Sequence, residues 1–225
     1  MTAFPESLLQ KLSAARVVAG FSVDRVEDAV PLAQALLAGG ISVVELTLRT
    51  KAGMAAVKEI SAGVPDMLLG VGTILTPEQA AQVHANGADF GVSPGLNVRV
   101  VQAAQRVGLP FAPGISTPAE LEAAIEQDCR LVKFFPAEAA GGLAYLRSMA
   151  APYAHLGIQY FPLGGLNADN MVDYLRQPNI PAIGGSWIVK KDLVDAGDWD
   201  QITARRYLTP LNFPSPRYET YRKFW

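Results

Sequence analysis

The sequence contains few residues that could form covalent or metal-bound cross-links. In 225 residues it has one cysteine, Cys129, and two histidines, His84 and His155. A single cysteine excludes an intramolecular disulfide framework and fits a reducing compartment, where we expect it to be a small buried side chain. Because neither histidine has carboxylate neighbours at the spacing of metal ligands, we predict no metal site.

The chain also lacks a strong net charge and a long apolar run. Its formal net charge is −2, which provides no field for a polyanion, so nucleic acid is not an expected partner. No apolar run reaches the roughly 18 residues that would span a membrane. Pro5, Glu6 and Lys11 interrupt the N-terminus where a signal peptide would need an apolar stretch. We therefore expect a cytoplasmic protein with no membrane partner.

The composition is that of one compact globular domain. Half of the residues are hydrophobic and 18% are charged, a balance that favours a buried core over disorder. A chain of this length fits one large α/β domain better than two small ones. We assign residues 1–205 to this domain. Residues 206–225, which are rich in tyrosine, phenylalanine, proline and arginine, form a separate C-terminal tail in this prediction.

Short apolar or β-branched segments recur along the chain and alternate with alanine-rich stretches. Helix starts are marked by Thr76-Pro77 and Thr117-Pro118, an N-cap followed by proline at the first helical position. Such alternation predicts parallel βαβ units. Eight units in a chain of this length match a single-domain (β/α)₈ TIM barrel, with an extra helix at 5–15, better than a doubly wound open sheet. The predicted strands are 17–19, 43–47, 68–72, 89–92, 110–112, 131–134, 158–161 and 180–183.

Lys133 is the most informative residue of these strands. It lies between Val132 and Phe134 in an apolar segment that ends at Pro136. An exposed lysine, with a pKa near 10.4, is only about 0.04% neutral amine at pH 7. Apolar surroundings disfavour the charged form, which leaves a nucleophile able to form a Schiff base with a carbonyl compound. The alternative is a lysine that reaches solvent or pairs with a carboxylate.

Two further polar residues lie at a predicted strand end, where active sites of (β/α)₈ barrels are found. Glu45 stands in an otherwise apolar strand, so its side chain is expected to point inward. Beside an inward lysine it could form a structural ion pair or shuttle protons to and from a Schiff-base amine. Arg49, near the rim, could bind a carboxylate or phosphate with its planar guanidinium, or face solvent.

Paired glycines follow the seventh and eighth predicted strands, at Gly164-Gly165 and Gly184-Gly185. Glycine allows backbone N–H groups to approach a ligand closely, and barrels frequently bind phosphate after these two strands. A single glycine pair is also common in ordinary turns. Two pairs at these positions favour a phosphate site.

Several motifs together resemble the 2-keto-3-deoxy-6-phosphogluconate (KDPG) aldolases, class I enzymes that also act as 4-hydroxy-2-oxoglutarate aldolases. The match runs in order from about residue 5 to residue 205. The motifs are Glu45-Leu46-Thr47-Leu48-Arg49-Thr50, Gly70-Val71-Gly72-Thr73, Ser93-Pro94-Gly95, Val132-Lys133-Phe134-Phe135-Pro136-Ala137-Glu138 and Ile183-Gly184-Gly185-Ser186-Trp187.

The resemblance implies a homotrimeric (β/α)₈ lyase that needs no metal or other cofactor. Its small-molecule partners are a 2-keto-3-deoxy sugar-acid phosphate and pyruvate. Lys133 is expected to form the Schiff base and Glu45 to move protons. Arg49 and Thr73 are expected to hold the keto-acid carboxylate, and Pro94 to form part of an apolar wall. The remaining implied residues are Phe135 in that wall and, for the phosphate, Gly164, Gly165, Gly184, Gly185 and Ser186.

One position departs from the family pattern. Where the family has threonine before the seventh-strand glycines, this chain has Leu163. The resemblance places a substrate-contacting hydroxyl there, and aldolases for the 6-phosphogalactonate epimer also lack it, so that substrate is an alternative. More distant alternatives are a sugar-phosphate epimerase or isomerase barrel without a covalent amine, and a catalytically silent sugar-phosphate sensor. Fold alone does not separate these functions.

Overall fold

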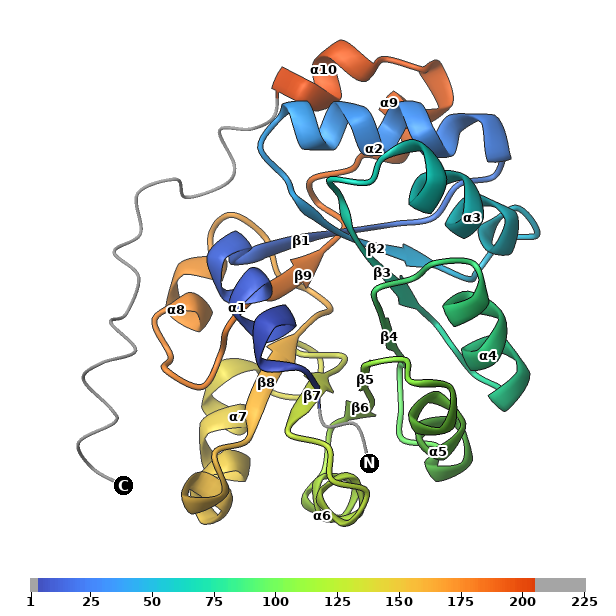
Figure 1. The fold of residues 1–225 in the computed structure, drawn as a ribbon. Helices are drawn as coiled ribbons and strands as arrows, with labels where there is room; N and C mark the ends of the chain where they lie inside the picture. Colours follow the sequence, from blue (N-terminus) through green and yellow to red (C-terminus); the bar gives the residue numbers. More distant parts are fainter. Residues whose placement is uncertain (1–3, 205–225) are drawn as a thin grey trace.

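The computed structural model describes residues 4–204, in which strands and helices alternate along the chain (Figure 1). The strands are β1 (Val17–Phe21), β2 (Val43–Thr47), β3 (Leu68–Gly72), β4 (Phe90–Val92), β5 (Phe111–Ala112), β6 (Gly114–Ile115), β7 (Leu131–Phe134), β8 (Gln159–Pro162) and β9 (Ile183–Gly185). The α-helices are α1 (Glu6–Ala15), α2 (Ala29–Ala38), α3 (Gly53–Gly63), α4 (Pro77–Ala85), α5 (Val98–Val107), α6 (Pro118–Glu126), α7 (Gly142–Ala150), α8 (Met171–Leu175), α9 (Lys191–Ala196) and α10 (Trp199–Ala204). Two 3₁₀ segments, η1 (Val26–Asp28) and η2 (Ala151–Leu156), complete the order.

All pairings between these strands are parallel, as the alternation predicted. Six strands form a curled sheet in the order β5-β4-β3-β2-β1-β9, and three form a second sheet in the order β6-β7-β8. The predicted fifth strand, 110–112, corresponds to β5; a further short strand that was not predicted, β6, follows after Pro113, which has no N–H to donate to a sheet. A parallel bridge between Leu163 and Gly184 links the segment after β8 to β9.

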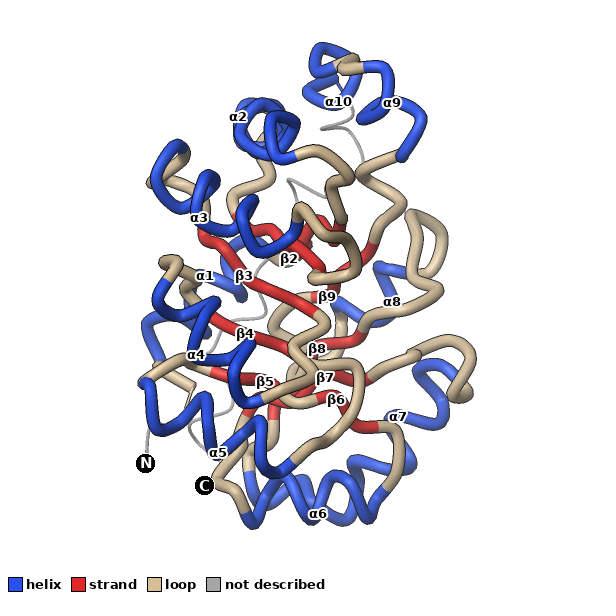
Figure 2. The backbone as a smooth tube through the Cα atoms, turned by 90° about the vertical axis from the view of Figure 1, so that its right-hand side faces the viewer, coloured by secondary structure: helices blue, strands red, loops and turns tan. Residues whose placement is uncertain are grey.

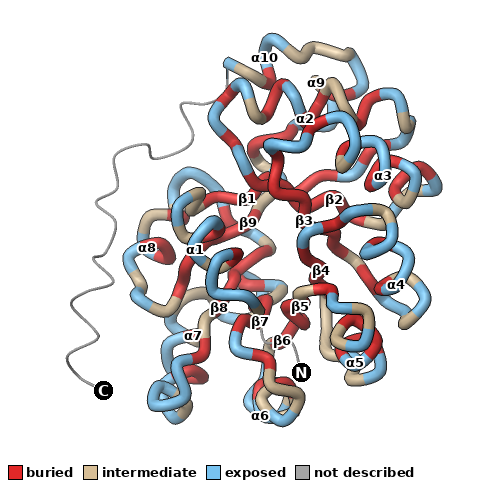
Figure 3. The backbone as a smooth tube through the Cα atoms, viewed as in Figure 1, coloured by how far each residue is buried: buried red, intermediate tan, exposed pale blue. Residues whose placement is uncertain are grey.

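Helices surround the strands, and the strands are buried (Figures 2 and 3). Alternate residues of each strand face two separate apolar clusters. In β2, Val44 and Leu46 belong to the larger cluster, which includes core residues of the helices. Val43, on the other face, belongs to an inner cluster with Phe90 and Phe161 from other strands. Side chains that share the second face are therefore directed inward, between the strands.

The N-terminal helix α1 covers one end of this inner cluster. Leu8 and Leu12 of α1 are buried against Val18, Val43 and Leu131 from the beginnings of strands. Burial of each leucine stabilises the docking by about 1.5–3 kcal/mol. This confirms the extra helix expected at 5–15 and closes the interior at the N-terminal strand ends, so that access is left at the other end.

Local signals set the helix boundaries that the sequence predicted. Thr76 and Thr117 each form a capping box with the side chain three residues later, and proline follows at the first helical position. Gly108 ends α5 in the left-handed conformation, with φ of 80°. The tail assigned to residues 206–225 lies outside the described residues. Among residues 4–204, no helix has the length and apolar character that crossing a bilayer requires.

Candidate active site

Lys133 of β7 and Glu45 of β2 meet in the interior. Both point inward, as strand alternation predicted for Glu45 and apolar neighbours for Lys133, and they are 4% and 2% exposed. The Nζ atom of Lys133 donates a hydrogen bond of 2.8 Å to Oε1 of Glu45. The two residues come from different sheets and are 88 positions apart in sequence. The fold alone brings this amine and carboxyl group together.

Glycines leave room for the carboxyl group. Glu45 is the register partner of Gly20 on β1 and of Gly70 on β3. At Gly72, near the end of β3, a Cβ atom would overlap Oε1 of Glu45. On the side of the amine, the ring centroid of Phe135 lies 5.2 Å from Nζ of Lys133, a cation–π distance. The pair is thus enclosed by glycine backbone and an aromatic ring.

A buried pair of this kind is weak evidence for stability, because the cost of removing both charges from water can exceed their attraction. Its chemical capacity is clearer. A desolvated amine is a nucleophile towards carbonyl carbon, and a carboxyl group within hydrogen-bond distance can give a proton to it or take one away. The arrangement supplies both parts of Schiff-base chemistry at one point.

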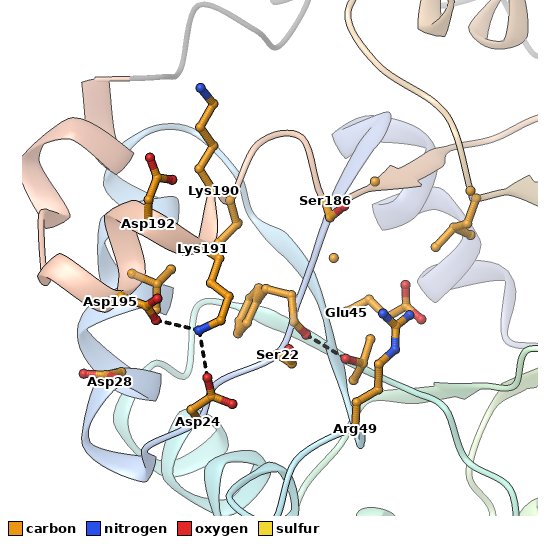
Figure 4. Close-up of a pocket in the computed structure, with 18 of the residues that line it drawn as sticks. Ser22, Asp24, Asp28, Glu45, Arg49, Ser186, Lys190, Lys191, Asp192 and Asp195 are labelled. Atoms are coloured by element: carbon orange, nitrogen blue, oxygen red, sulfur yellow. Dashed lines mark hydrogen bonds and ion pairs between the residues drawn. The ribbon is translucent and has the colours of Figure 1, made fainter.

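This pair lies at a pocket with a volume of about 680 Å³. Figure 4 shows Glu45 and Arg49 towards one side of the pocket, and Lys191 between Asp24 and Asp195 towards another. Arg49, which is exposed, lines the pocket and so has access to a ligand. Eight of the predicted site residues line it: Glu45, Arg49, Lys133, Phe135, Leu163, Gly164, Gly185 and Ser186.

Four predicted residues, Thr73, Pro94, Gly165 and Gly184, are not part of the pocket lining in the described chain. Gly184 is covered by the side chain of Leu163, since a Cβ at 184 would lie 2.7 Å from Cδ2 of that leucine. Thr73 follows Gly72 directly and has a φ of 62°, a left-handed conformation that is uncommon outside glycine. The roles of these four residues stay predictions.

The charged residues at the pocket mouth were not predicted from the sequence. Lys191 donates to Asp195 at 2.7 Å and to Asp24 at 2.8 Å. The hydrogen bond to Asp195, and then that to Asp24, raise the pKa of the Lys191 ammonium. Asp24 follows the first strand closely and Lys191 the last, so position after a strand end was the available signal. The pocket lining also includes Ser22, Asp28, Lys190 and Asp192, which were likewise not predicted from the sequence.

Within residues 4–204, histidine, cysteine, aspartate and glutamate do not gather in any group of three that could hold a metal ion. His84 is exposed on α4 and His155 is exposed in η2. Cys129 is 6% exposed, which confirms the expectation of a small buried side chain. Burial, with a further contribution from Asp128, raises the pKa of its thiol to about 11.

Comparison with known proteins identifies the family of this chain. The family model for KDPG and KHG aldolases, where KHG is 2-keto-4-hydroxyglutarate, matches residues 8–205. The chain belongs to this family. It is therefore an aldolase, a carbon–carbon lyase, and the family resemblance read from its motifs is confirmed.

Individual family members are similar over nearly their whole length. The 2-dehydro-3-deoxy-phosphogluconate aldolase of Haemophilus influenzae is 41% identical over 88% of this chain and 92% of its own. The KDPG aldolase of Legionella pneumophila, solved with pyruvate captured as a covalent carbinolamine, has 37% identity and a TM-score of 0.84, covering 89% and 97% of the two chains. The Zymomonas mobilis enzyme, solved with 3-phosphoglycerate, has 33% identity and a TM-score of 0.82, covering 93% and 97%.

Proposed function

We propose that this protein is a class I aldolase that cleaves KDPG to pyruvate and glyceraldehyde 3-phosphate through a Schiff base on Lys133. The observation that carries the proposal is the buried 2.8 Å contact between Lys133 and Glu45 at the pocket. The covalent pyruvate adduct of the Legionella relative supports it, because carbinolamine formation is the first step of such a reaction. The same chemistry extends to 4-hydroxy-2-oxoglutarate, which is also a 2-keto acid with a hydroxyl at C4.

The reaction begins with attack of the neutral Lys133 amine on the C2 ketone. The carbinolamine loses water to form an iminium, with Glu45 supplying the proton that the departing hydroxyl needs. The iminium then withdraws the electrons of the C3–C4 bond as the C4 hydroxyl proton is removed, by Glu45 directly or through a water. Glyceraldehyde 3-phosphate leaves, an enamine remains, and its protonation at C3 followed by hydrolysis releases pyruvate and restores the amine.

The pocket residues fit the charges at the two ends of the substrate. Arg49 at the exposed mouth is suited to the keto-acid carboxylate, because guanidinium and carboxylate can form two parallel hydrogen bonds. Thr73 is proposed to assist it, with Pro94 and Phe135 beside the apolar part of the substrate. The phosphate is proposed to bind to backbone groups of Gly164, Gly165, Gly184 and Gly185 and to the hydroxyl of Ser186.

A second substrate is favoured by one observation. Leu163 is 5% exposed and lines the pocket with an alkyl side chain, at the position where the resemblance predicts a hydroxyl in gluconate-specific enzymes. Without that hydroxyl, the C4 epimer 2-keto-3-deoxy-6-phosphogalactonate is the alternative substrate. The chemistry at Lys133 is the same for both epimers.

We also propose that the two sheets form one closed (β/α)₈ barrel within residues 1–205, that the protein acts in the cytoplasm, and that it assembles as a homotrimer. The bridge from Leu163 to Gly184 and the Lys133–Glu45 contact between the sheets support closure of the barrel.

The homotrimeric assembly follows from the family resemblance. Light scattering at micromolar concentration tests it, and a monomer mass would contradict it.

Borohydride reduction in the presence of pyruvate tests the proposed reaction. Reduction of the iminium would attach the pyruvate carbons irreversibly to the amine, and we expect this mass increase on the peptide that carries Lys133. Lys133→Met, which keeps an unbranched apolar side chain, should show none. A wild-type protein that gains no mass at this peptide would refute the aldolase mechanism and favour an epimerase or isomerase that uses no covalent amine.

A further inference from the structure

The loop that follows β8 is held by hydrogen bonds to its carbonyl oxygens. The carbonyl of Leu163 accepts from the backbone N–H of Ala137 at 2.7 Å, and the carbonyl of Gly164 accepts from the backbone N–H of Glu138 at 3.0 Å. The next carbonyl, of Gly165, accepts from the side-chain amide Nδ2 of Asn170 at 3.2 Å. Three successive peptide carbonyls are thus held, two by backbone donors of the segment after β7 and one by Asn170 at the end of the same loop.

These bonds set the direction of the N–H groups. In a planar trans peptide the N–H points opposite to the carbonyl. With the carbonyls of Gly164 and Gly165 held by Glu138 and Asn170, the N–H groups of Gly165 and Leu166 point away from those two residues. Gly164 and Gly165 have φ values of 94° and 83°, and successive N–H groups in such turns form anion-binding concavities.

The Glu138 side chain packs against the same loop. A Cβ atom at Gly165 would lie 2.6 Å from Cβ of Glu138, so these two residues are packed directly together. The hydroxyl of Tyr174, a 2% exposed residue of α8, donates to Oε1 of Glu138 at 2.5 Å. Burial, and then the bond to Glu138, raise the pKa of the Tyr174 hydroxyl, so it keeps its proton and stays a donor.

We propose that Asn170 and the Glu138–Tyr174 pair are positioning residues that aim the N–H groups of Gly165 and Leu166 at the phosphate of the substrate. None of the three needs to touch the substrate, because they act through the loop. The inference rests on the proposed function and deepens it. It also adds Leu166, through its backbone, to the groups that recognise the phosphate.

The test compares a reaction that uses the phosphate with one that does not. Asn170→Ala removes the amide that holds the Gly165 carbonyl. We expect the KM for KDPG to rise about tenfold, with kcat changed less than about threefold. The exchange of pyruvate methyl protons with solvent deuterium uses the same Schiff base but no phosphate, so its KM for pyruvate should stay within about twofold. Tyr174→Phe keeps the buried ring, removes the donor to Glu138, and should produce the same split.

Asp173→Ala is the matched control, since Asp173 lies in α8, is exposed, and pairs with Arg176 rather than with the loop. Both KM values should match the wild type in this variant. An unchanged KM for KDPG in both Asn170→Ala and Tyr174→Phe would overturn the assignment. An equal rise in both KM values would do so as well, because it would indicate general damage to the site. Borohydride trapping of pyruvate in each variant reports Lys133 separately, so a failure of the aldolase mechanism would be recognised as such.

Discussion

Gly72 leaves the space that the carboxyl group of Glu45 occupies: a Cβ atom at position 72 would overlap Oε1 of that side chain. We predict that Gly72→Ala displaces the carboxyl group from Lys133 and lowers kcat by about 10²-fold, the lower range of a general acid–base contribution. A Cβ at Gly20, by contrast, would lie 3.6 Å from Oε2 of Glu45, an ordinary contact. Gly20→Ala should change kcat by less than about threefold. A wild-type kcat in Gly72→Ala would show that the position of the carboxyl group is unimportant.

Glu45→Gln separates proton transfer from binding. Glutamine is nearly isosteric and can still accept a hydrogen bond from Lys133, but it cannot take up a proton. We predict that KM changes little while kcat falls by about 10²–10⁴-fold. Steady-state kinetics with KDPG provide the measurement. Turnover at the wild-type rate would show that the buried pair is structural.

Leu163→Thr is predicted to change the ratio of kcat/KM between KDPG and its 6-phosphogalactonate epimer by about tenfold, because a hydroxyl in the pocket can distinguish the two orientations at C4. Leu163→Val is the matched control, since valine has the shape of threonine without the hydroxyl. The ratio should move in the threonine variant and not in the valine variant. A ratio that is the same in all three proteins would remove this position from substrate selection.

The raised pKa of the Cys129 thiol predicts that stability depends on pH. The pKa of this thiol is raised from 9.0 to about 11 in the folded protein. Above pH 9 the unfolded thiol loses its proton while the folded thiol keeps it, so ionisation favours unfolding and the free energy of unfolding falls between pH 9 and pH 11. By pH 10.5 the free energy of unfolding has fallen by about 2 kcal/mol from this cause. Urea unfolding of wild type and Cys129→Ala, at pH 8 and pH 10.5 with reductant, measures it. Parallel losses in the two proteins would contradict the raised pKa.

Local sequence determined much of the secondary structure. The Thr-Pro starts at Thr76 and Thr117 predicted helices that begin at Pro77 and Pro118, because an N-cap and proline act through their immediate neighbours. Most strand positions followed from short apolar segments, and the inward direction of Glu45 from alternation along one of them. The last strand, predicted at 180–183, lies instead at Ile183–Gly185. The short strand β6, which follows Pro113, was not predicted, and the predicted fifth strand corresponds to β5 alone.

The sequence by itself also determined which chemistry was possible, since a lysine in an apolar strand and a carboxylate in another limit the reactions that can occur. Only the tertiary structure decided that Lys133 and Glu45 are 2.8 Å apart, that Arg49 lines the same pocket, and that Glu138 packs against Gly165. The physical reason is the separation in sequence between the residues that interact. Caps and alternation depend on residues a few positions apart, whereas these contacts depend on the packing of strands and loops that the chain order does not place side by side.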